Sequence, residues 1–430
     1  MYYNSKNRSI LAKIIQQLNN DLILILIGPR QTGKTTLQKM LIEYLHTKQP
    51  RAKTFYFDME IPDNLKHFSD YKTIHDFLVS KGMTSDITTM LFLDEFQKIP
   101  TPTKTLKILH DHYPYLKIIA TGSSSLTINK SLRDESAAGR KRIFHILPLD
   151  FSEYLDFRNL PEQLSAHQNI LQKNLDTSAA DAETKTAWEQ FAVWGGYPRV
   201  AIHASDEEKR ASLQEIQSAY LERDIAKMIP ESELTAFIKF TSLLSAQSSG
   251  LFNINEISKI SSVSRFKTDK YVFLLEQSFI IHTIKPFFNN KQKELIKMPK
   301  LFFLDTGLRN HITQNFAEPA LRADKGQLME NAVYVELLKY LPAGATIQYW
   351  RTAQGAEVDF VVRKDNETIP VEVKYQPFQK PTVPSGLKSF IEQYNPPRAF
   401  VITRDYSAHT KYHSCEVLFL PAYFTEKIFL

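Results

Sequence analysis

An apolar run, a glycine-containing loop and a helical pattern follow one another without interruption between residues 22 and 45. Residues 22–27 are hydrophobic throughout and rich in isoleucine, as expected of a strand that is buried on both faces of a parallel sheet. Residues 28–35 read GPRQTGKT and match the motif G-x-x-x-x-G-K-[ST] in full. Apolar residues then recur at helical spacing up to Leu45. The order strand, glycine loop and helix occurs in few folds, and it predicts the first strand and helix of a P-loop α/β sheet.

The loop has the residue types that phosphate binding requires. Glycine lets the backbone wrap around phosphate groups, so that N–H groups and the helix N-terminus point at negative charge. Lys34 would neutralise the β and γ phosphates of ATP, and the Thr35 hydroxyl would bind Mg²⁺. The alternative, a glycine turn with a surface lysine, does not account for the complete motif in this context. The residues expected to hold the nucleotide are Gly28, Arg30, Gln31, Thr32, Gly33, Lys34, Thr35 and Thr36.

A second apolar run, residues 89–93, ends in two adjacent acids. Asp94 would hold Mg²⁺, and Glu95 would orient or deprotonate the water that attacks the γ-phosphate. Two carboxylates on a solvated turn are the alternative. Glu95 is the residue that favours hydrolysis over nucleotide binding alone.

Two further residues extend this predicted site. Ser123 ends an apolar strand pattern, at the edge where open α/β sheets bind ligands, and would sense the γ-phosphate. Arg140 precedes another apolar strand and would stabilise transition-state charge as an arginine finger. An ordinary hydroxyl-rich loop and a surface basic cluster remain the alternatives. A finger that acts in trans would require a homo-oligomer, which the sequence leaves open.

These motifs resemble those of a known family. The segments GPRQTGKTT, LFLDEFQ, ATGSSS, AGRKRI with LPLDFSEYL, and GGYPR at 195–199 look like those of bacterial and archaeal AAA-type ATPases that carry a C-terminal domain of unknown function, itself related to PD-(D/E)xK nucleases. The resemblance covers nearly the full chain. It implies an AAA-like core with a helical lid, and it places Arg140 at the family's Gly-Arg position.

The chain length and the patterns together predict an α/β protein of several domains. A chain of 430 residues is long enough for about three domains of roughly 150 residues. We expect a P-loop AAA-type ATPase core at 1–150, a helical lid at 151–232, a winged helix-turn-helix at 233–300 and a restriction-endonuclease-like domain at 301–430.

The winged helix-turn-helix is predicted from the order helix, helix, turn, helix and apolar hairpin. Ten basic and four acidic residues lie between residues 239 and 300, so this segment carries the net charge of +6 of the whole chain. The helix that would contact DNA has Arg265, Lys267 and Lys270 near its start. Many winged helices serve as protein scaffolds instead, and this alternative stays open.

Two strand patterns near the C-terminus place charged residues on one face. By the period of two, Asp359, Glu372 and Lys374 point to the same side, where Glu330 from the preceding helix would meet them. Hard oxygen ligands of this kind suit Mg²⁺ or Mn²⁺, and the lysine would polarise a phosphate or a water. This is the PD-(D/E)xK arrangement, with Val358 in place of the motif's proline. The alternative is a solvated strand face or a site that binds without cleaving.

Composition excludes several other classes. The single cysteine, Cys415, allows neither an internal disulfide nor a cysteine-based zinc site, which fits a reducing compartment. The early apolar run is far shorter than the ~18 residues that span a bilayer, and the N-terminus lacks the apolar core of a signal peptide. We therefore expect a cytoplasmic protein that hydrolyses ATP and binds DNA, with DNA cleavage left open. The alternative is an ATP-driven signalling or scaffolding switch with an inactive C-terminal domain.

Overall fold

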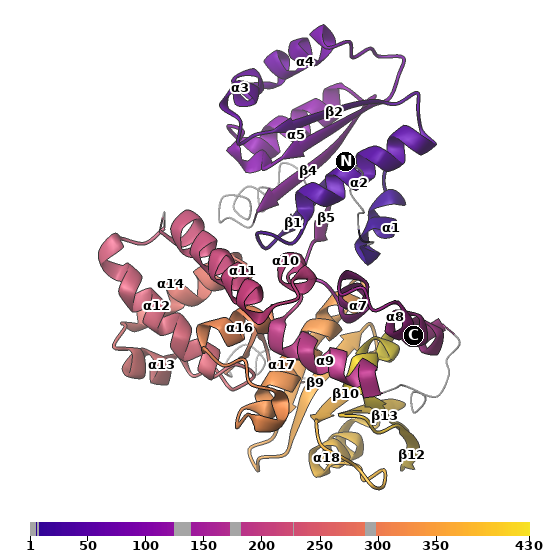
Figure 1. Ribbon diagram of the computed structural model, residues 1–430, viewed down its shortest axis with the longest axis vertical. Coiled ribbons are helices and arrows are strands. Elements are labelled where there is room, and N and C mark those ends of the chain that lie inside the picture. Colours follow the sequence, from indigo (N-terminus) through magenta and orange to yellow (C-terminus); the bar gives the residue numbers. More distant parts are fainter. Residues whose placement is uncertain (1–5, 7, 124–138, 173–181, 227, 289–297) are drawn as a thin grey trace. The chain divides into compact units, whose positions relative to one another are not determined.

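The chain divides into two compact units, each with its own sheet (Figure 1). The computed structural model describes residues 6, 8–123, 139–172, 182–226, 228–288 and 298–430. The first unit comprises Met1–Leu147 with Gln277–Phe279, and the second comprises Pro148–Glu276 with Ile280–Leu430. Apart from Gln277–Phe279, which lie within the predicted winged helix, the segments predicted as lid, winged helix and C-terminal domain fall in the second unit, so their boundaries stay predictions.

The first unit contains a parallel sheet of five strands in the order β2-β3-β4-β1-β5. Its strands are β1 (Ile23–Gly28), β2 (Lys53–Asp58), β3 (Thr89–Asp94), β4 (Leu116–Ser123) and β5 (Lys141–His145). Its helices are α1 (Ser9–Ile15), α2 (Lys34–Lys48), α3 (Pro62–Leu65), η1 (Lys66–Phe68), α4 (Tyr71–Ser80), η2 (Phe96–Lys98) and α5 (Pro102–His112). Because β4 lies between β1 and β3, the P-loop and the acidic strand end are separated by one strand.

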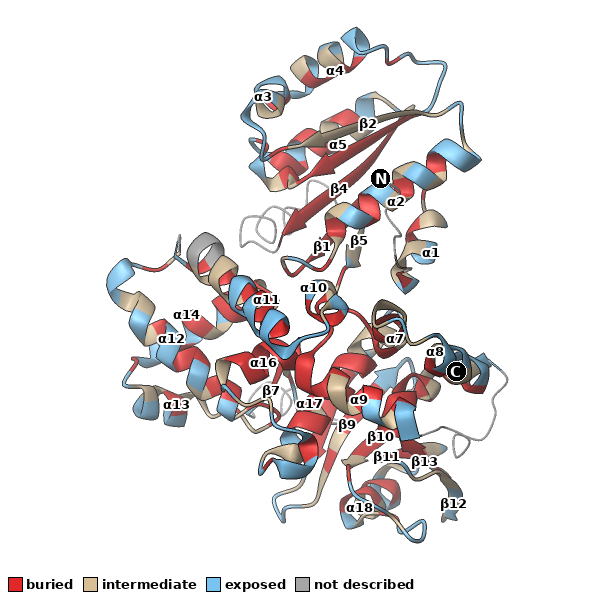
Figure 2. Cartoon of the chain, viewed as in Figure 1, coloured by how far each residue is buried: buried red, intermediate tan, exposed pale blue. Residues whose placement is uncertain are grey.

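Apolar side chains cover both faces of this sheet. All residues of β1, β3 and β4 are buried, as the red strands of Figure 2 illustrate for β1 and β4. Along β1, Leu24 and Leu26 pack with residues of α1 and α2, whereas Ile25 and Ile27 pack with residues of α4 and α5. Alternate residues of a strand point to opposite faces, so helices cover the sheet on both sides. The predicted α/β class with a parallel sheet is confirmed.

The second unit begins with helices. They are α7 (Phe151–Phe157), α8 (Pro161–Gln172), α9 (Ala182–Trp194), α10 (Pro198–Ile202), α11 (Asp206–Ala219), the π-helix η5 (Tyr220–Ile225), α12 (Glu231–Ala246), α13 (Ile254–Ser261) and α14 (Arg265–Gln277). An antiparallel pair of strands, β6 (Ile281–Ile284) and β7 (Lys300–Phe303), follows α14. Next come α16 (Thr306–Ile312) and η6 (Pro319–Leu321). No helix in the described ranges is long and apolar enough to cross a membrane.

A mixed sheet of six strands completes the second unit, in the order β12-β13-β11-β10-β9-β8. The elements are α17 (Lys325–Tyr340), β8 (Thr346–Arg351), β9 (Glu357–Lys364), β10 (Glu367–Lys374), α18 (Ser385–Tyr394), β11 (Arg398–Thr403), β12 (Ala408–Tyr412), β13 (Cys415–Pro421) and η7 (Ala422–Phe429). Strands β8, β9 and β10 form an antiparallel meander, and β10, β11 and β13 run parallel. Trp350, Val358 and Phe390 belong to the apolar core that joins this sheet to α18.

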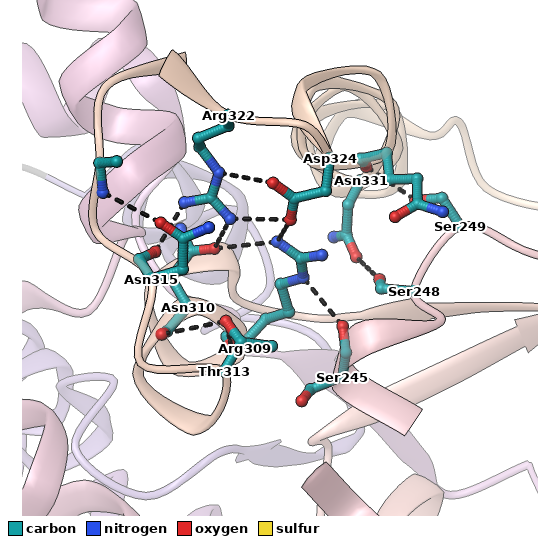
Figure 3. Close-up of polar contacts among 12 residues, drawn as sticks. Ser245, Ser248, Ser249, Arg309, Asn310, Thr313, Asn315, Arg322, Asp324 and Asn331 are labelled. Atoms are coloured by element: carbon teal, nitrogen blue, oxygen red, sulfur yellow. Dashed lines mark hydrogen bonds and ion pairs between the residues drawn. The ribbon is translucent and has the colours of Figure 1, made fainter. Parts of the chain in front are cut away.

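A buried polar network holds the segment that precedes α17 (Figure 3). The carboxylate of Asp324 lies 2.6 Å from Nη1 of Arg309 and 2.8 Å from Nε of Arg322. Both guanidinium groups also donate to the side-chain oxygen of Asn310, each at 3.0 Å. Because both arginines are buried, Asp324 supplies the charge that makes their burial tolerable.

The network predicts a stability loss for Asp324→Asn. The change removes the carboxylate shared by two buried guanidinium groups, and the free energy of unfolding of the second unit should fall by roughly 3 kcal/mol. Urea unfolding followed by tryptophan fluorescence measures this, because all three tryptophans, Trp188, Trp194 and Trp350, belong to the second unit. Asp365→Asn, which changes an exposed turn residue, is the matched control and should leave stability unchanged.

The same network predicts a pH dependence. The hydrogen bond from Arg322, with the charge of Arg309, lowers the pKa of Asp324 from its usual 3.8 to about 2. A lowered folded-state pKa contributes stability above the unfolded value, and this contribution disappears as the pH falls through about 2. The stability difference between wild type and Asp324→Asn should therefore shrink from about pH 4 to pH 2. A difference that stays constant over this range would contradict the assignment.

Candidate functional site

Backbone geometry fixes the glycines of the P-loop. A Cβ atom on Gly28, at the end of β1, would lie 2.2 Å from the carbonyl oxygen of Ile146. Gly33 is the N-cap of α2 and has a φ of +89°, in the left-handed region that favours glycine. Glycine is therefore required at position 28 because a side chain would clash with Ile146, and at position 33 because the backbone has a positive φ. Gln31 between them also has a positive φ, of 60°.

The Lys34 ammonium lies within this loop. Its Nζ atom donates to the carbonyl oxygens of Gly28, at 3.0 Å, and Pro29, at 2.6 Å. The Thr32 hydroxyl donates to the same Pro29 oxygen at 2.9 Å. The loop thus places a positive charge beside the N-terminus of α2, which is the arrangement that attracts phosphate. The remaining predicted loop residues flank it: Arg30 is half-buried, and Gln31 and Thr36 are exposed.

Arg8 braces the P-loop from outside the motif. Its Nη1 donates to the carbonyl oxygen of Thr32 at 2.7 Å, and its Nη2 donates to that of Leu147 at 2.8 Å. The side chain is buried, with 6% exposed. Arg8 was not predicted, because it lies 24 residues before Thr32 and belongs to no motif.

The two predicted Mg²⁺ ligands meet at the carboxyl edge of the sheet. The Thr35 hydroxyl donates to Oδ2 of Asp94 at 2.7 Å. The Tyr56 hydroxyl donates to the same oxygen at 3.1 Å, and the Thr121 hydroxyl donates to Oδ1. Burial, followed by the charge of Asp94, raises the pKa of Tyr56, so its phenol stays a donor. Tyr56 and Thr121 were not predicted, because only the strand order brings them to Asp94.

Glu95 and Ser123 form a second pair at this edge. Oε2 of Glu95 accepts hydrogen bonds from the Ser123 hydroxyl, at 2.8 Å, and from the side-chain amide of Gln97. Glu95 has a φ of 52°, a left-handed conformation that costs a residue with a side chain about 1 kcal/mol. The strained turn points the carboxylate at Ser123, next to the Thr35–Asp94 pair along the sheet edge.

Arg140 lies at the opposite edge of the sheet, and its predicted role as an arginine finger within its own chain is wrong. Its carbonyl oxygen accepts from the amide of Ile23, at the start of β1, whereas the P-loop follows the end of β1. Five residues of strand separate the two edges by roughly 16 Å. The guanidinium instead pairs with Asp111, with Nε 2.6 Å from Oδ1. A role in a neighbouring copy stays a prediction.

Arg8 generates a testable prediction for this site. Arg8→Ala removes two hydrogen bonds from a charged group, each of which contributes about 1.5 to 3 kcal/mol, and should weaken binding of a fluorescent ATP analogue by about tenfold or more. Fluorescence titration measures the dissociation constant. Lys13→Ala, an exposed change on α1, is the control. Equal affinity in the Arg8 variant and the control would show that the loop does not depend on this brace.

A second polar cluster lies in the second unit, where the C-terminal site was predicted. Lys374 donates to Glu372 with Nζ 2.5 Å from Oε1, and Oδ2 of Asp359 accepts from the amide of Val373 at 2.8 Å. The amide of Asp359 lies 3.4 Å from Oε2 of Glu372. Glu330 reaches the same place from α17, because it and Asp359 contact one lysine, Lys300.

Lys300 was not predicted as part of this cluster. Its Nζ atom, on a side chain that is 3% exposed, lies 2.6 Å from Oε1 of Glu357, 3.0 Å from Oε1 of Glu330 and 3.6 Å from Oδ1 of Asp359. Burial alone would lower the pKa of Lys300, but the carboxylates outweigh it and the net shift is upward. Lys300 therefore remains a cation inside the cluster.

The predicted Mg²⁺ or Mn²⁺ site of Glu330, Asp359 and Glu372 is not formed. Within the part of the chain that the structure describes, no three Asp, Glu, His or Cys side chains are arranged to hold a metal ion. The physical reason is that the Lys300 ammonium lies between the carboxylates of Glu330 and Asp359. Burial, followed by the charge of Asp359, raises the pKa of Glu372 to about 7.

The residues predicted to contact DNA lie at the start of α14. Arg265 and Lys267 are exposed and Lys270 is half-buried. Nζ of Lys267 lies 2.9 Å from Oε1 of Glu233 on α12, so this lysine is paired within the protein. Phe266, between the two exposed cations, is 80% exposed. Three of the ten basic residues in this region, Lys291, Lys293 and Lys297, lie outside the described residues.

Three family models match separate parts of the chain. Residues 20–155 match a family described as AAA domain, which supports an AAA-type ATPase core. Residues 185–318 and 325–423 match two families described as domains of unknown function, DUF8612 and DUF4143. The C-terminal match therefore does not support the relation to PD-(D/E)xK nucleases that the resemblance implied.

Similar proteins occur in distant organisms. An uncharacterized protein of Haemophilus influenzae is 25% identical over 95% of this chain and 96% of its own length. One of Mycobacterium tuberculosis is 25% identical over 86% of this chain and 74% of its own length. Among solved structures, the Walker-type ATPase of Pyrococcus abyssi is similar with a TM-score of 0.46 and 13% identity, over 72% of this chain and 96% of its own.

Proposed function

We propose that this protein is a Mg²⁺-dependent ATPase whose nucleotide site is the P-loop edge of the first unit. The observation that carries the proposal is the contact between Thr35 and Asp94, 2.7 Å apart, next to the pair of Glu95 and Ser123. A hydroxyl and a carboxylate are oxygen ligands of the kind that Mg²⁺ prefers, usually together with phosphate oxygens. When bound, the ion would neutralise charge on the transferring phosphoryl group.

Separate residues of the site would bind the phosphates and activate the attacking water. Lys34 and the N-terminus of α2 bind the β and γ phosphates. Glu95 orients the attacking water and accepts its proton, while Ser123 and Gln97 hold the Glu95 carboxylate at the sheet edge. A γ-phosphate that binds Ser123 would compete with Glu95 for its hydroxyl. In this way Ser123 would link nucleotide occupancy to the position of the base.

Two substitutions separate binding from turnover. Glu95→Gln should keep ATP binding while the rate of phosphate release falls by about 10²-fold or more, because an amide cannot accept the proton. Lys34→Ala should lose binding itself. Phosphate release and titration with an ATP analogue measure the two quantities, and Glu43→Gln on the exposed face of α2 is the charge-matched control. Turnover at the wild-type rate in Glu95→Gln would remove Glu95 from the mechanism.

We further propose that the second unit binds nucleic acid through a winged helix-turn-helix formed by α12, α13, α14 and the β6–β7 pair. The element order and the exposed cations at the start of α14 support this assignment. Arg265 and Lys270 are the stronger candidates for phosphate contacts. Lys267 contributes less, because it must first leave Glu233.

Salt dependence tests the nucleic-acid proposal. Arg265→Ala combined with Lys270→Ala should weaken binding of duplex DNA and reduce the slope of log K against log salt by about two, since each phosphate contact contributes close to one. Fluorescence anisotropy at several salt concentrations measures the slope. Arg363→Ala combined with Lys364→Ala removes two exposed charges from the same unit and is the control. The same slope in both double variants would eliminate α14 as the contact.

The second candidate function is a switch whose C-terminal domain does not catalyse. Lys300 favours it over DNA cleavage, because the ammonium lies among the carboxylates that a nuclease would use to bind its metal. In this case ATP hydrolysis would control binding at α14 or to a protein partner, and no bond in DNA would break.

A further inference from the structure

Lys300 is held in place by the backbone on both of its sides. Its strand β7 pairs with β6, where Lys300 is opposite Ile284, and Lys300 also bridges to Leu251. The neighbouring amide of Leu301 donates to Gly250. The backbone position of Lys300 is therefore fixed from two sides, and its side chain, which is 3% exposed, is enclosed by the protein.

Helix α17 fixes the other end of β7. The side chain of Asn331 is fully buried and bonds both backbone groups of Phe303: its Nδ2 donates to the carbonyl oxygen at 2.7 Å, and its Oδ1 accepts from the amide at 2.9 Å. Figure 3 shows Asn331 beside Ser248, whose hydroxyl also bonds it. Glu330, the preceding residue of α17, makes its own contact with β7 through Lys300, at 3.0 Å.

Each carboxylate of the cluster has a cation supplied by the chain. Glu372 pairs with Lys374, and Glu357 pairs with Arg351, with Nη1 of Arg351 3.3 Å from Oε2. Lys300 contacts the three remaining acidic oxygens, from Glu330, Glu357 and Asp359. Partly buried charges are tolerated when they are paired, and here three cations of the chain, Lys300, Arg351 and Lys374, offset most of the charge of the four carboxylates.

The distances decide which cation fits. An ammonium donates hydrogen bonds to carboxylate oxygens at N–O distances of 2.7–2.9 Å, whereas Mg²⁺ requires oxygens at 2.0–2.1 Å and several free lone pairs. Lys300 lies at 2.6 to 3.6 Å from its three partners, and the lone pairs that face it are used. A divalent ion at this place would compete with the ammonium for the same oxygens and would be repelled by its charge.

We propose that Lys300 is the resident cation of this carboxylate cluster. It takes the place of a divalent metal, ties β7 to α17 and β9, and prevents Mg²⁺ or Mn²⁺ from binding there. The inference concerns the second unit alone and does not depend on ATP hydrolysis in the first.

Titration with Mn²⁺ tests this inference on the full-length protein without nucleotide. Electron paramagnetic resonance measures free Mn²⁺ in the presence of wild type, Asp359→Asn, Lys300→Met, Lys300→Arg and the double variant Lys300→Met with Asp359→Asn. Wild type and Asp359→Asn should bind equally. Lys300→Met should bind one additional Mn²⁺ per chain, because it frees three carboxylates. Lys300→Arg, which keeps the charge, and the double variant should not gain this ion.

Two outcomes would overturn the inference. The first is a Mn²⁺ bound by wild type and lost in Asp359→Asn, which would show that a metal enters despite Lys300. The second is a folded Lys300→Met variant, verified by circular dichroism, that gains no Mn²⁺. If Lys300→Met does not fold, Lys300→Gln, which also removes the charge but keeps a polar side chain, takes its place with the same expected gain of one Mn²⁺ and the same contradicting outcome.

Discussion

Burial of the central strands on both faces determines where chemistry can occur in the first unit. Because β1, β3 and β4 are buried along their length and apolar in their central residues, the polar side chains of the site come from the last residues of the strands and the turns that follow them. In a parallel sheet these ends share one edge. Thr35, Asp94, Thr121 and Ser123 meet there although they come from different elements. The buried sheet therefore determines where the polar residues of the site lie, and the glycines of the P-loop shape the backbone between β1 and α2.

In the second unit, the main constraint is the charge of clustered carboxylates. These carboxylates are partly or fully buried, and an unpaired charge in such surroundings is costly. The chain supplies the missing cations itself, with Lys300 among the cluster carboxylates and Arg309 with Arg322 around Asp324. Both clusters lie along the elements that flank α17. In the second unit, lysine and arginine side chains thus offset the charge of the carboxylates, as a bound metal ion does in other proteins.

The range over which residues interact explains which predictions succeeded. The P-loop could be read from the sequence because its strand, loop and helix are contiguous, and the pairing of Thr35 with Asp94 followed from the motifs. Arg140 was misplaced because residue patterns give the position of a strand and not the edge at which it begins. Arg8 and Lys300 were missed because each acts across many residues on a partner that no motif connects to it. The common face of Asp359, Glu372 and Lys374 followed from the strand period, but the cation that fills it did not.

One pair of strands connects the two proposals for the second unit. Helix α14, which carries the candidate nucleic-acid contacts, ends at Gln277, and the chain continues directly into β6 at Ile281. Strand β6 pairs with β7 along its whole length, so Lys300 and the C-terminal end of β6 share one ladder. The position of β6 is therefore linked to the backbone of Lys300 through the hydrogen bonds of this ladder. The ion pairs of Lys300 with Glu330, Glu357 and Asp359 in turn hold β7 against α17 and β9.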